Sequence, residues 1–412
     1  MIRVDFITLS RSDYSSLRPV ALAALDDPEI DVKLIAGGSH LLERFGRTID
    51  SIIADGFPSI EKIDFLNADD NSDSEMAAAY GRAVQGFEKL LGNDRPDFIF
   101  LVGDRWEMLA PVTVASMLRI PIAHHSGGDI TQGSADNQTR YVLTTLSHLH
   151  FTALEEHADR LIRMGEEPWR VRVTGEPALT ALGQYGKNNS EVRASLNLKK
   201  NEPFVLATFH PTSYDELPLA DQIELFIQAL DLVEESLVIT APNPDPGSAV
   251  FLESLSRYAQ NHERVHLVKN LGPERYYAAM AQAQFMIGNS SSGLWEAPSF
   301  GLPVVNIGHR QDGRVRGANV LDAGLNLSEI RIAIGKARDS GFRKKIQGMG
   351  NPYVNADTID KILRGLKEKR SRADWLAKVF TDPLKIAEVK PVTNRWGIKS
   401  HEGINPLKDQ IL

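Results

Sequence analysis

The sequence predicts an α/β protein with two doubly wound domains. The chain has 412 residues, of which 42% are hydrophobic, so it can fill the cores of two domains of ordinary size. Short β-rich runs alternate with helical patterns along most of the chain, as in parallel sheets that are covered by helices. A polar, glycine-containing stretch at residues 184–190 separates two such series and is the best candidate for a linker.

Composition and charge exclude several classes of function. The formal net charge is -8, whereas nucleic acids and acidic membranes select basic surfaces, so we expect neither as a partner. The chain contains no cysteine and hence no disulfide, thiolate zinc site or cysteine nucleophile, which suits a cytoplasmic protein. The apolar stretch at the N-terminus is too short and too interrupted by charges to be a signal peptide. No apolar run approaches the roughly 18 residues that a membrane-spanning helix needs. We therefore expect a cytoplasmic protein that does not span a membrane.

The chain opens with a βαβ pattern. β-Rich runs at Val4–Leu9 and Val32–Ala36 flank a helical pattern at Tyr14–Leu25. The turn before this helix places Arg11 and several hydroxyl groups at a helix entrance, where an anion is readily bound. Asp13, in the same turn, is interpreted as an ordinary helix cap.

A continuous apolar run at residues 96–102 predicts a central parallel strand that is buried on both faces. Asp104 and Arg105 follow at its carboxyl end, where open α/β sheets bind their ligands. A local salt bridge is the alternative interpretation of these two charges.

The next expected strand, Ile120–His124, leads into a polar loop that contains three glycines and ends at Asp136. Loops of this kind at strand ends usually line a cleft. From Asp136 onward the pattern predicts an amphipathic helix with a polar side toward the cleft, although Asp136 and Arg140 could simply form a surface ion pair. The histidines have no convincing metal-ligand spacing, so we expect no metal site.

The second half repeats the alternation of strands and helices. Its expected strands are Phe204–Phe209, Leu237–Thr240, Val265–Leu267, Gln284–Ile287 and Pro303–Ile307. Polar loops follow at residues 210–213, 242–248, 288–296 and 308–314. Four such loops at one sheet edge predict a binding site.

The loop Gly288–Glu296 is the most informative of the four. It joins a buried strand to a short helical segment, so unpaired backbone N–H groups and three serine hydroxyls can meet a phosphate. Glu296 stands about one turn further on, where it can accept hydrogen bonds from neutral hydroxyls such as those of a ribose. The alternative is that Ser291 or Ser292 caps the helix and Glu296 complements its dipole.

These patterns divide the chain into three parts. We expect an N-terminal domain at residues 1–185 and a C-terminal domain at residues 190–365. Residues 366–412 would form a C-terminal helix and tail. The basic runs beyond Ile334 are interpreted as solvated surface.

Motifs from both halves together resemble those of the hydrolysing UDP-N-acetylglucosamine 2-epimerases, and the resemblance extends in register to about residue 365. The motifs that carry it are Gly103-Asp104-Arg105, the loop from Gly127 through Asp129 to Asp136 and Arg140, His210-Pro211, Pro242-Asn243, Gly288–Gly293 with Glu296, and Arg310-Gln311. Each is weak alone, but the set is specific. The non-hydrolysing relatives usually have His-Val-Glu-Ala-Gly where this chain has residues 124–128, so the hydrolysing branch fits better.

The resemblance implies the GT-B architecture, with two Rossmann-like domains across a cleft and a C-terminal helix that returns to the first domain. It implies a UDP-sugar substrate, either UDP-N-acetylglucosamine or UDP-N,N′-diacetylbacillosamine, and the products UDP and the C2-epimerised free sugar. Such sugars feed the synthesis of sialic or legionaminic acid. No metal or redox cofactor is implied, and a homo-oligomer, either a dimer or a tetramer, is expected.

The resemblance also assigns roles to residues. Ser290 and Ser291 would hold the diphosphate, and Glu296 would hold the ribose hydroxyls. The other residues assigned to the nucleotide pocket are Arg11, Arg105, His210, Asn243 and Arg310. The carboxylates assigned to catalysis are Asp104 and Asp136, with Asp129 behind them.

The family chemistry is elimination of UDP followed by hydration of the resulting glycal, which requires a base and an acid near C1 and C2. This chain has Ser126, Asn137 and Tyr141 where many relatives have ionisable residues. Two alternatives therefore stay open, a GT-B glycosyltransferase and a nucleotide-sugar-binding protein with weakened catalysis. The identity of the sugar and the choice between uridine and guanosine also stay open.

Overall fold

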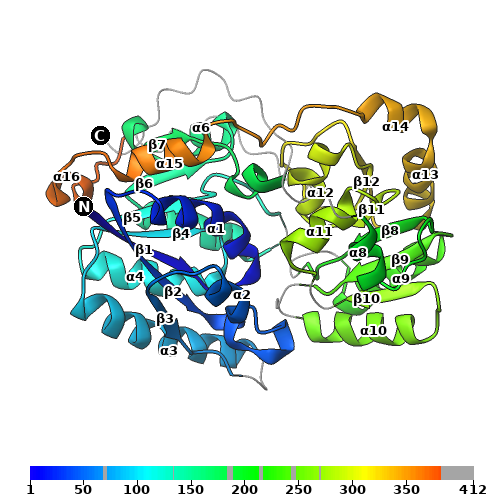
Figure 1. The fold of residues 1–412 in the computed structure, drawn as a ribbon, viewed down its shortest axis with the longest axis horizontal. Helices are drawn as coiled ribbons and strands as arrows, with labels where there is room; N and C mark the ends of the chain where they lie inside the picture. The colour runs from blue at the N-terminus through cyan, green and yellow to red at the C-terminus, as the bar shows by residue number, and fades with distance from the viewer. Residues whose placement is uncertain are drawn as a thin grey trace, which may run out of the picture.

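The computed structural model describes residues 1–67, 72–132, 134–182, 189–212, 217–242, 247–268 and 271–381. Figure 1 shows two lobes, each with one sheet and its covering helices. All strand pairs within the described ranges are parallel, and helices connect most successive strands. The α/β fold with two Rossmann-like doubly wound domains is confirmed.

The first sheet has the strand order β3-β2-β1-β4-β5-β6-β7. Its strands are β1 (Ile2–Thr8), β2 (Ile30–Gly37), β3 (Ile60–Ile63), β4 (Phe98–Val102), β5 (Ile122–His125), β6 (Leu149–Thr152) and β7 (Val171–Val173). Its helices are α1 (Arg11–Leu25), α2 (Ile49–Ala54), α3 (Asp73–Asn93), α4 (Leu109–Met117), α5 (Asp136–Leu146) and α6 (Glu155–Arg163). The order reverses between β1 and β4, so the loops after these strands border the position where such sheets bind ligands.

The second sheet has the order β10-β9-β8-β11-β12-β13, which reverses between β8 and β11. Its strands are β8 (Phe204–Thr208), β9 (Ser236–Thr240), β10 (Val265–Val268), β11 (Met286–Gly288), β12 (Val304–Ile307) and β13 (Val320–Ala323). Its helices are α8 (Asn189–Ser195), α9 (Leu219–Asp231), α10 (Ser248–Gln260), α11 (Gly272–Met280), α12 (Ser292–Trp295), α13 (Leu327–Arg338) and α14 (Ser340–Ile346).

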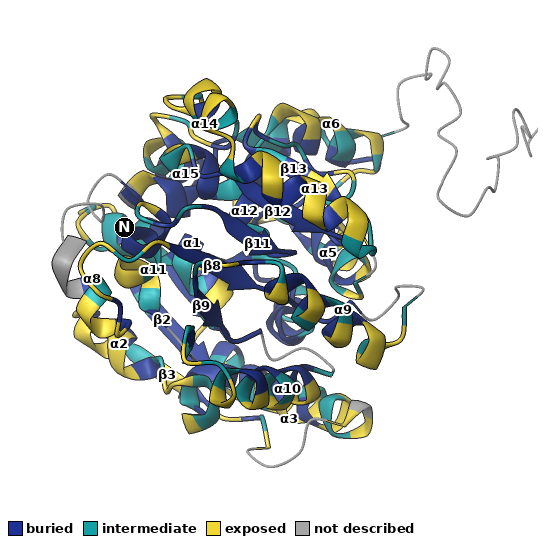
Figure 2. Ribbon diagram, turned by 90° about the vertical axis from the view of Figure 1, so that its right-hand side faces the viewer, coloured by how far each residue is buried: buried dark blue, intermediate teal, exposed yellow. Residues whose placement is uncertain are grey.

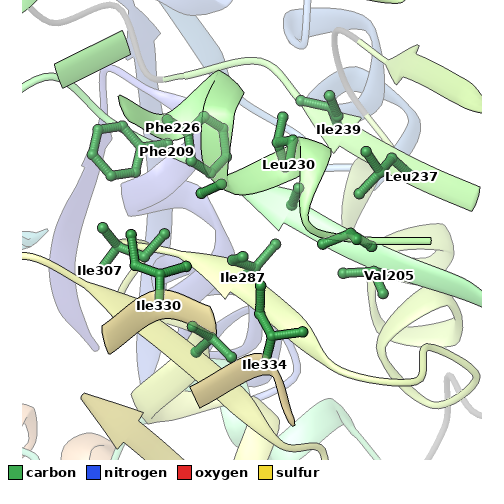
Figure 3. Packing of buried hydrophobic residues seen from close by; sticks show 14 of the residues in the cluster. Val205, Phe209, Phe226, Leu230, Leu237, Ile239, Ile287, Ile307, Ile330 and Ile334 are labelled. Carbon is green, nitrogen blue, oxygen red and sulfur yellow. The ribbon is translucent and has the colours of Figure 1, made fainter. Parts of the chain in front are cut away.

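Burial accounts for the apolar runs in the strands. Every residue of β4 and of β8 is buried, as in central strands with helices on both faces. In the second domain, strand side chains pack with Phe226 and Leu230 of α9 and with Ile330 and Ile334 of α13 (Figure 3). Figure 2 shows the same division, with buried strands inside and exposed outer faces on α3, α9 and α13.

The end of the described chain returns to the first domain. The helices α15 (Thr358–Leu366) and α16 (Arg372–Leu376) lie beside the first sheet in Figure 1. α15 contributes buried side chains to the first core, and the Trp375 ring meets Phe98 edge-on with 5.2 Å between centroids. The expected domain boundaries stay a prediction, although α15 shows that the chain already packs on the first domain before residue 365. The tail beyond residue 381 lies outside the described residues.

Within the described part of the chain, no helix combines the length and the apolar character needed to cross a lipid bilayer.

Candidate active site between the two domains

The turn after β11 begins the site on the second domain. The expected strand, turn and helix are present, with Ser290 buried and Ser291 preceding α12. A Cβ atom on Gly288 would lie 1.8 Å from the Thr208 oxygen of β8, and the φ angle of Gly288 is 138°, so only glycine fits. Since α12 is a single turn, its dipole is weak. An anion here would depend mainly on the serine hydroxyls and the N–H groups of the turn.

Asn289 links this turn to two neighbouring loops. Its Oδ1 accepts a hydrogen bond from the His210 backbone N–H (2.7 Å), and its Nδ2 donates to the His210 oxygen (2.8 Å). Its own backbone oxygen accepts from Gln311 Nε2 (2.7 Å) and from Arg310 Nη1 (3.2 Å). The structure thus brings His210, Arg310 and the serine turn to one sheet edge.

Glu296 is a buried carboxylate that follows α12. It is 8% exposed, and its Oε2 has no hydrogen-bond partner among the described residues. Burial, and then the charge of Glu176, raise the pKa of Glu296 to about 7. Glu176 follows β7 and accepts a hydrogen bond from Ser16 Oγ of α1 (2.5 Å). A buried acceptor without a donor is suited to a neutral hydroxyl group of a ligand.

Arg11 of α1 meets the second domain at Tyr276 of α11. Burial lowers the pKa of Arg11, and the nearby Tyr276 acts in the opposite direction. Burial also raises the pKa of Tyr276 to about 12, whereas hydrogen bonds of its hydroxyl with Ser292 and Thr208 act to lower this pKa. Tyr276 was not predicted, because a single tyrosine on a helix forms no motif.

Three carboxylates surround one buried arginine on the first domain. Arg140 is 1% exposed, and its guanidinium forms an ion pair with Asp104. It also donates to the backbone oxygen of Asp129 (2.9 Å). Burial acts to lower the pKa of Arg140, but the charges of Asp104, Asp129 and Asp136 hold it above its ordinary value. Arg140 is therefore a buried arginine that pairs with Asp104 and interacts electrostatically with Asp129 and Asp136.

Asp129 connects this centre to the second domain. It is 2% exposed, and Arg314, in the loop after β12, lies 2.7 Å from its Oδ2. Burial acts to raise the pKa of Asp129, but the charges of Arg314 and Arg140 outweigh burial and hold the pKa below its ordinary value. Asp129 is thus an ionised, buried carboxylate.

Arg105 and Asn243 are the remaining residues that were predicted to line the nucleotide pocket. Arg105 lies at the same sheet edge, and its guanidinium is bonded to Glu107 of its own domain (2.9 Å). A local ion pair is thus present, whereas its expected reach to the nucleotide stays a prediction. Asn243 lies outside the described residues. Among the described residues, no group of histidine and carboxylate side chains could hold a metal ion.

Comparison with known proteins identifies the family of the chain. The family model for UDP-N-acetylglucosamine 2-epimerase matches residues 23–367. The chain belongs to this epimerase family.

Two curated members of the epimerase family are similar to the chain over most of its length. One is the GDP/UDP-N,N′-diacetylbacillosamine 2-epimerase (hydrolyzing) of Campylobacter jejuni, with 32% identity over 92% of this chain and 99% of the relative. The other is the UDP-N,N′-diacetylbacillosamine 2-epimerase (hydrolyzing) of Legionella pneumophila, with 33% identity over 89% of this chain and 96% of the relative.

A solved structure has the same fold. It is the UDP-GlcNAc 2-epimerase from Neisseria meningitidis bound to UDP-GlcNAc, with a TM-score of 0.77 and 17% identity. The match covers 89% of this chain and all of that chain (100%).

Ser126, Asn137 and Tyr141 are the three positions at which the sequence was expected to depart from the family pattern. Ser126 has a positive φ of 77°, and its Oγ lies 2.9 Å from His125 Nδ1. Asn137 Oδ1 accepts a hydrogen bond from the Thr131 N–H (3.2 Å), whereas Tyr141 is 37% exposed. Ser126 and Asn137 therefore hold the loop in place, and Tyr141 points its ring partly to solvent.

Proposed function

We propose that this member of the epimerase family is a hydrolysing 2-epimerase of nucleotide-linked 2-acetamido sugars. It converts the UDP-sugar and water into UDP and the free, C2-epimerised sugar. The observation that carries the proposal is the buried Arg140, which pairs with Asp104 and donates to the Asp129 backbone and whose pKa is raised by the charges of Asp104, Asp129 and Asp136. The names of the relatives from Campylobacter jejuni and Legionella pneumophila support it.

The second domain binds the nucleotide in this proposal. Ser290 and Ser291, with the N–H groups of their turn, hold the diphosphate, and His210 and Arg310 add donors and charge beside it. Glu296 accepts hydrogen bonds from the ribose hydroxyls, which satisfies its unpartnered Oε2. The departing diphosphate is stabilised because these donors are already in place before its charge develops.

The remaining nucleotide contacts come from the first domain and from an adjacent loop. Arg11 begins α1 and approaches the same pocket beside Tyr276. Arg105 is held by Glu107 at the carboxyl end of β4, from which it reaches the diphosphate. Asn243 completes the pocket in this proposal.

The carboxylates of the first domain carry the proton transfers. Asp104 and Asp136 act as the base that removes the C2 proton and the acid that returns one to the opposite face. The C1–O bond to UDP breaks as the C2 proton leaves, which gives an unsaturated sugar, and water then adds at C1. Asp104 is the preferred base because its ion pair with Arg140 keeps it oriented and its side chain is 20% exposed.

The test is a product assay with UDP-N-acetylglucosamine, UDP-N,N′-diacetylbacillosamine and their GDP analogues. We expect free UDP together with a free epimerised sugar from at least one UDP-sugar, without any added acceptor. No release from any of the four would overturn the proposal, and release that requires an acceptor would indicate a glycosyltransferase. A dimer or tetramer in the cytoplasm is part of the same proposal. Light scattering measures the molar mass of the assembly and so checks the number of subunits.

A further inference from the structure

A buried ion pair joins the two domains beside the proposed reaction centre. Arg314 is 7% exposed, and its Nη2 lies 2.7 Å from Asp129 Oδ2, with Nε donating to Oδ1 at 3.3 Å. The same Nη2 donates to Thr131 Oγ1 (2.8 Å). Two side chains of the first domain are thus held by one guanidinium of the second.

The surroundings of Asp129 make this pair more than a surface contact. The ionisable groups that act on it come from several elements and are Arg140, His157, Arg160, Arg314 and Tyr353. Burial lowers the pKa of His157 to about 4, so the ring faces Asp129 as neutral imidazole, with Nε2 3.5 Å from Oδ1. The guanidinium groups of Arg140 and Arg314 balance the charge of Asp129. Of these two, only Arg314 belongs to the second domain.

Arg314 is itself tied to the proposed nucleotide site. Its Nη1 donates to Gln311 Oε1 (2.7 Å), and Gln311 Nε2 donates to the Asn289 oxygen in the serine turn (2.7 Å). Its guanidinium also lies over the Trp295 ring of α12, 5.3 Å from the centroid. The loop that carries Arg310 toward the turn therefore also carries Arg314 toward the carboxylates.

This contact requires the two domains to lie close together. A Cβ atom on Gly313 would lie 3.2 Å from Ile130 Cδ1, so the two loops touch. If the domains separate, Asp129 loses Arg314, and the charged groups that remain to act on it are Arg140 and Arg160 of its own domain. The ion pair thus exists only in the closed arrangement.

We propose that Arg314 is a positioning residue that orients Asp129 and holds the two domains closed over the reacting sugar. This inference rests on the proposed function and names the contact that joins its two halves. Arg314 acts through Asp129 and, through Gln311, couples the nucleotide turn to the carboxylate centre. A bound nucleotide therefore favours the arrangement in which the carboxylates are in place.

The test compares Arg314→Gln and Arg314→Lys with the wild type. Misplacing a reacting group by about 1 Å costs about 100-fold in rate, so we expect kcat of Arg314→Gln to fall by about that factor with little change in KM. The acid limb of the kcat/KM profile moves to higher pH, because loss of Arg314 lets burial raise the pKa of Asp129. Arg314→Lys keeps the charge and recovers part of the rate.

Arg338→Gln is the matched control. Arg338 forms an ion pair with Glu235 (2.6 Å) inside the second domain, so its loss removes an ion pair of similar length without touching the domain interface. We expect unchanged kcat and an unchanged pH profile for this variant. An Arg314→Gln enzyme with wild-type kcat and pH profile would overturn the inference.

Small-angle scattering separates this inference from the proposed function. We expect a larger radius of gyration for ligand-free Arg314→Gln than for the wild type and for Arg338→Gln. If no nucleotide sugar is turned over but the radius increases, the proposed reaction is wrong and the role of Arg314 in holding the domains closed stands. An unchanged radius would overturn that role.

Discussion

Glu296→Gln should stabilise the protein at alkaline pH while weakening nucleotide binding. The glutamine has nearly the same shape as the glutamate but cannot ionise. In the wild type, ionisation places a charge in a buried site where Oε2 has no hydrogen-bond partner among the described residues and Glu176 lies nearby. The charge is thus unfavourable for folding and useful only when a ligand supplies donors.

The magnitude follows from the two pKa values of Glu296. Its pKa is about 7 in the folded protein and 4.5 for the ordinary carboxyl group. Between these values the folded protein keeps a proton that the unfolded chain releases, so the free energy of unfolding decreases as pH rises. At about 1.4 kcal/mol per pKa unit, the loss approaches about 3 kcal/mol above pH 7. Glutamine avoids this loss, so its advantage is about 3 kcal/mol at pH 8 and below about 1 kcal/mol at pH 5.

Urea unfolding followed by tryptophan fluorescence at pH 5 and pH 8 measures this difference. The control is Glu253→Gln, because Glu253 is exposed and pairs only with Arg257 one helical turn away among the described contacts. Its effect should be the same at both pH values. Calorimetry with UDP should show roughly tenfold weaker binding to Glu296→Gln, since a neutral amide is a poorer acceptor than a carboxylate. A Glu296→Gln protein with no extra stability at pH 8 would show that ionised Glu296 does not destabilise the fold.

Two further substitutions test the site and the fold. Asp104→Asn should abolish sugar release while UDP affinity stays within about twofold, because Asp104 pairs with Arg140 in the other domain from the serine turn; retained turnover would exclude Asp104 as the base. Arg170→Met should lower the free energy of unfolding by about 3 kcal/mol, because the buried Arg170 pairs with Glu167 (2.6 Å) and donates to the Trp375 oxygen (2.8 Å). The control is Arg257→Met, which removes an exposed ion pair and should change the free energy of unfolding by less than about 0.5 kcal/mol. Equal losses of stability in the two variants would show that burial does not strengthen the contacts of Arg170.

The fold was predictable because its signals are local. The apolar runs at β4 and β8 identify buried parallel strands, and both are buried along their whole length. Gly288 also follows from local chemistry, since a strand, a tight turn and a helix meet there. The return of the chain at α15 was implied only by family resemblance, because nothing in residues 358–366 indicates which sheet they will cover.

The site was predictable only in part, since its motifs mark positions but not partners. Asp104, Asp129 and Asp136 were identified, and Arg140 was placed on a helix side toward the cleft, with a surface ion pair to Asp136 as the alternative, but its burial was not predicted. Its burial depends on the loops after β4 and β5, which no sequence spacing relates. Arg314 was seen only as part of a polar loop, because its contact with Asp129 exists only once the two domains are docked.

An NMR time course of the reaction in deuterated water tests the proposed elimination most directly. If a carboxylate removes the C2 proton as UDP leaves, the released sugar carries deuterium at C2 and has the epimerised configuration from the first turnover. Release of UDP with a fully protonated C2 and the original configuration would instead show simple hydrolysis at C1 and would rule out the elimination.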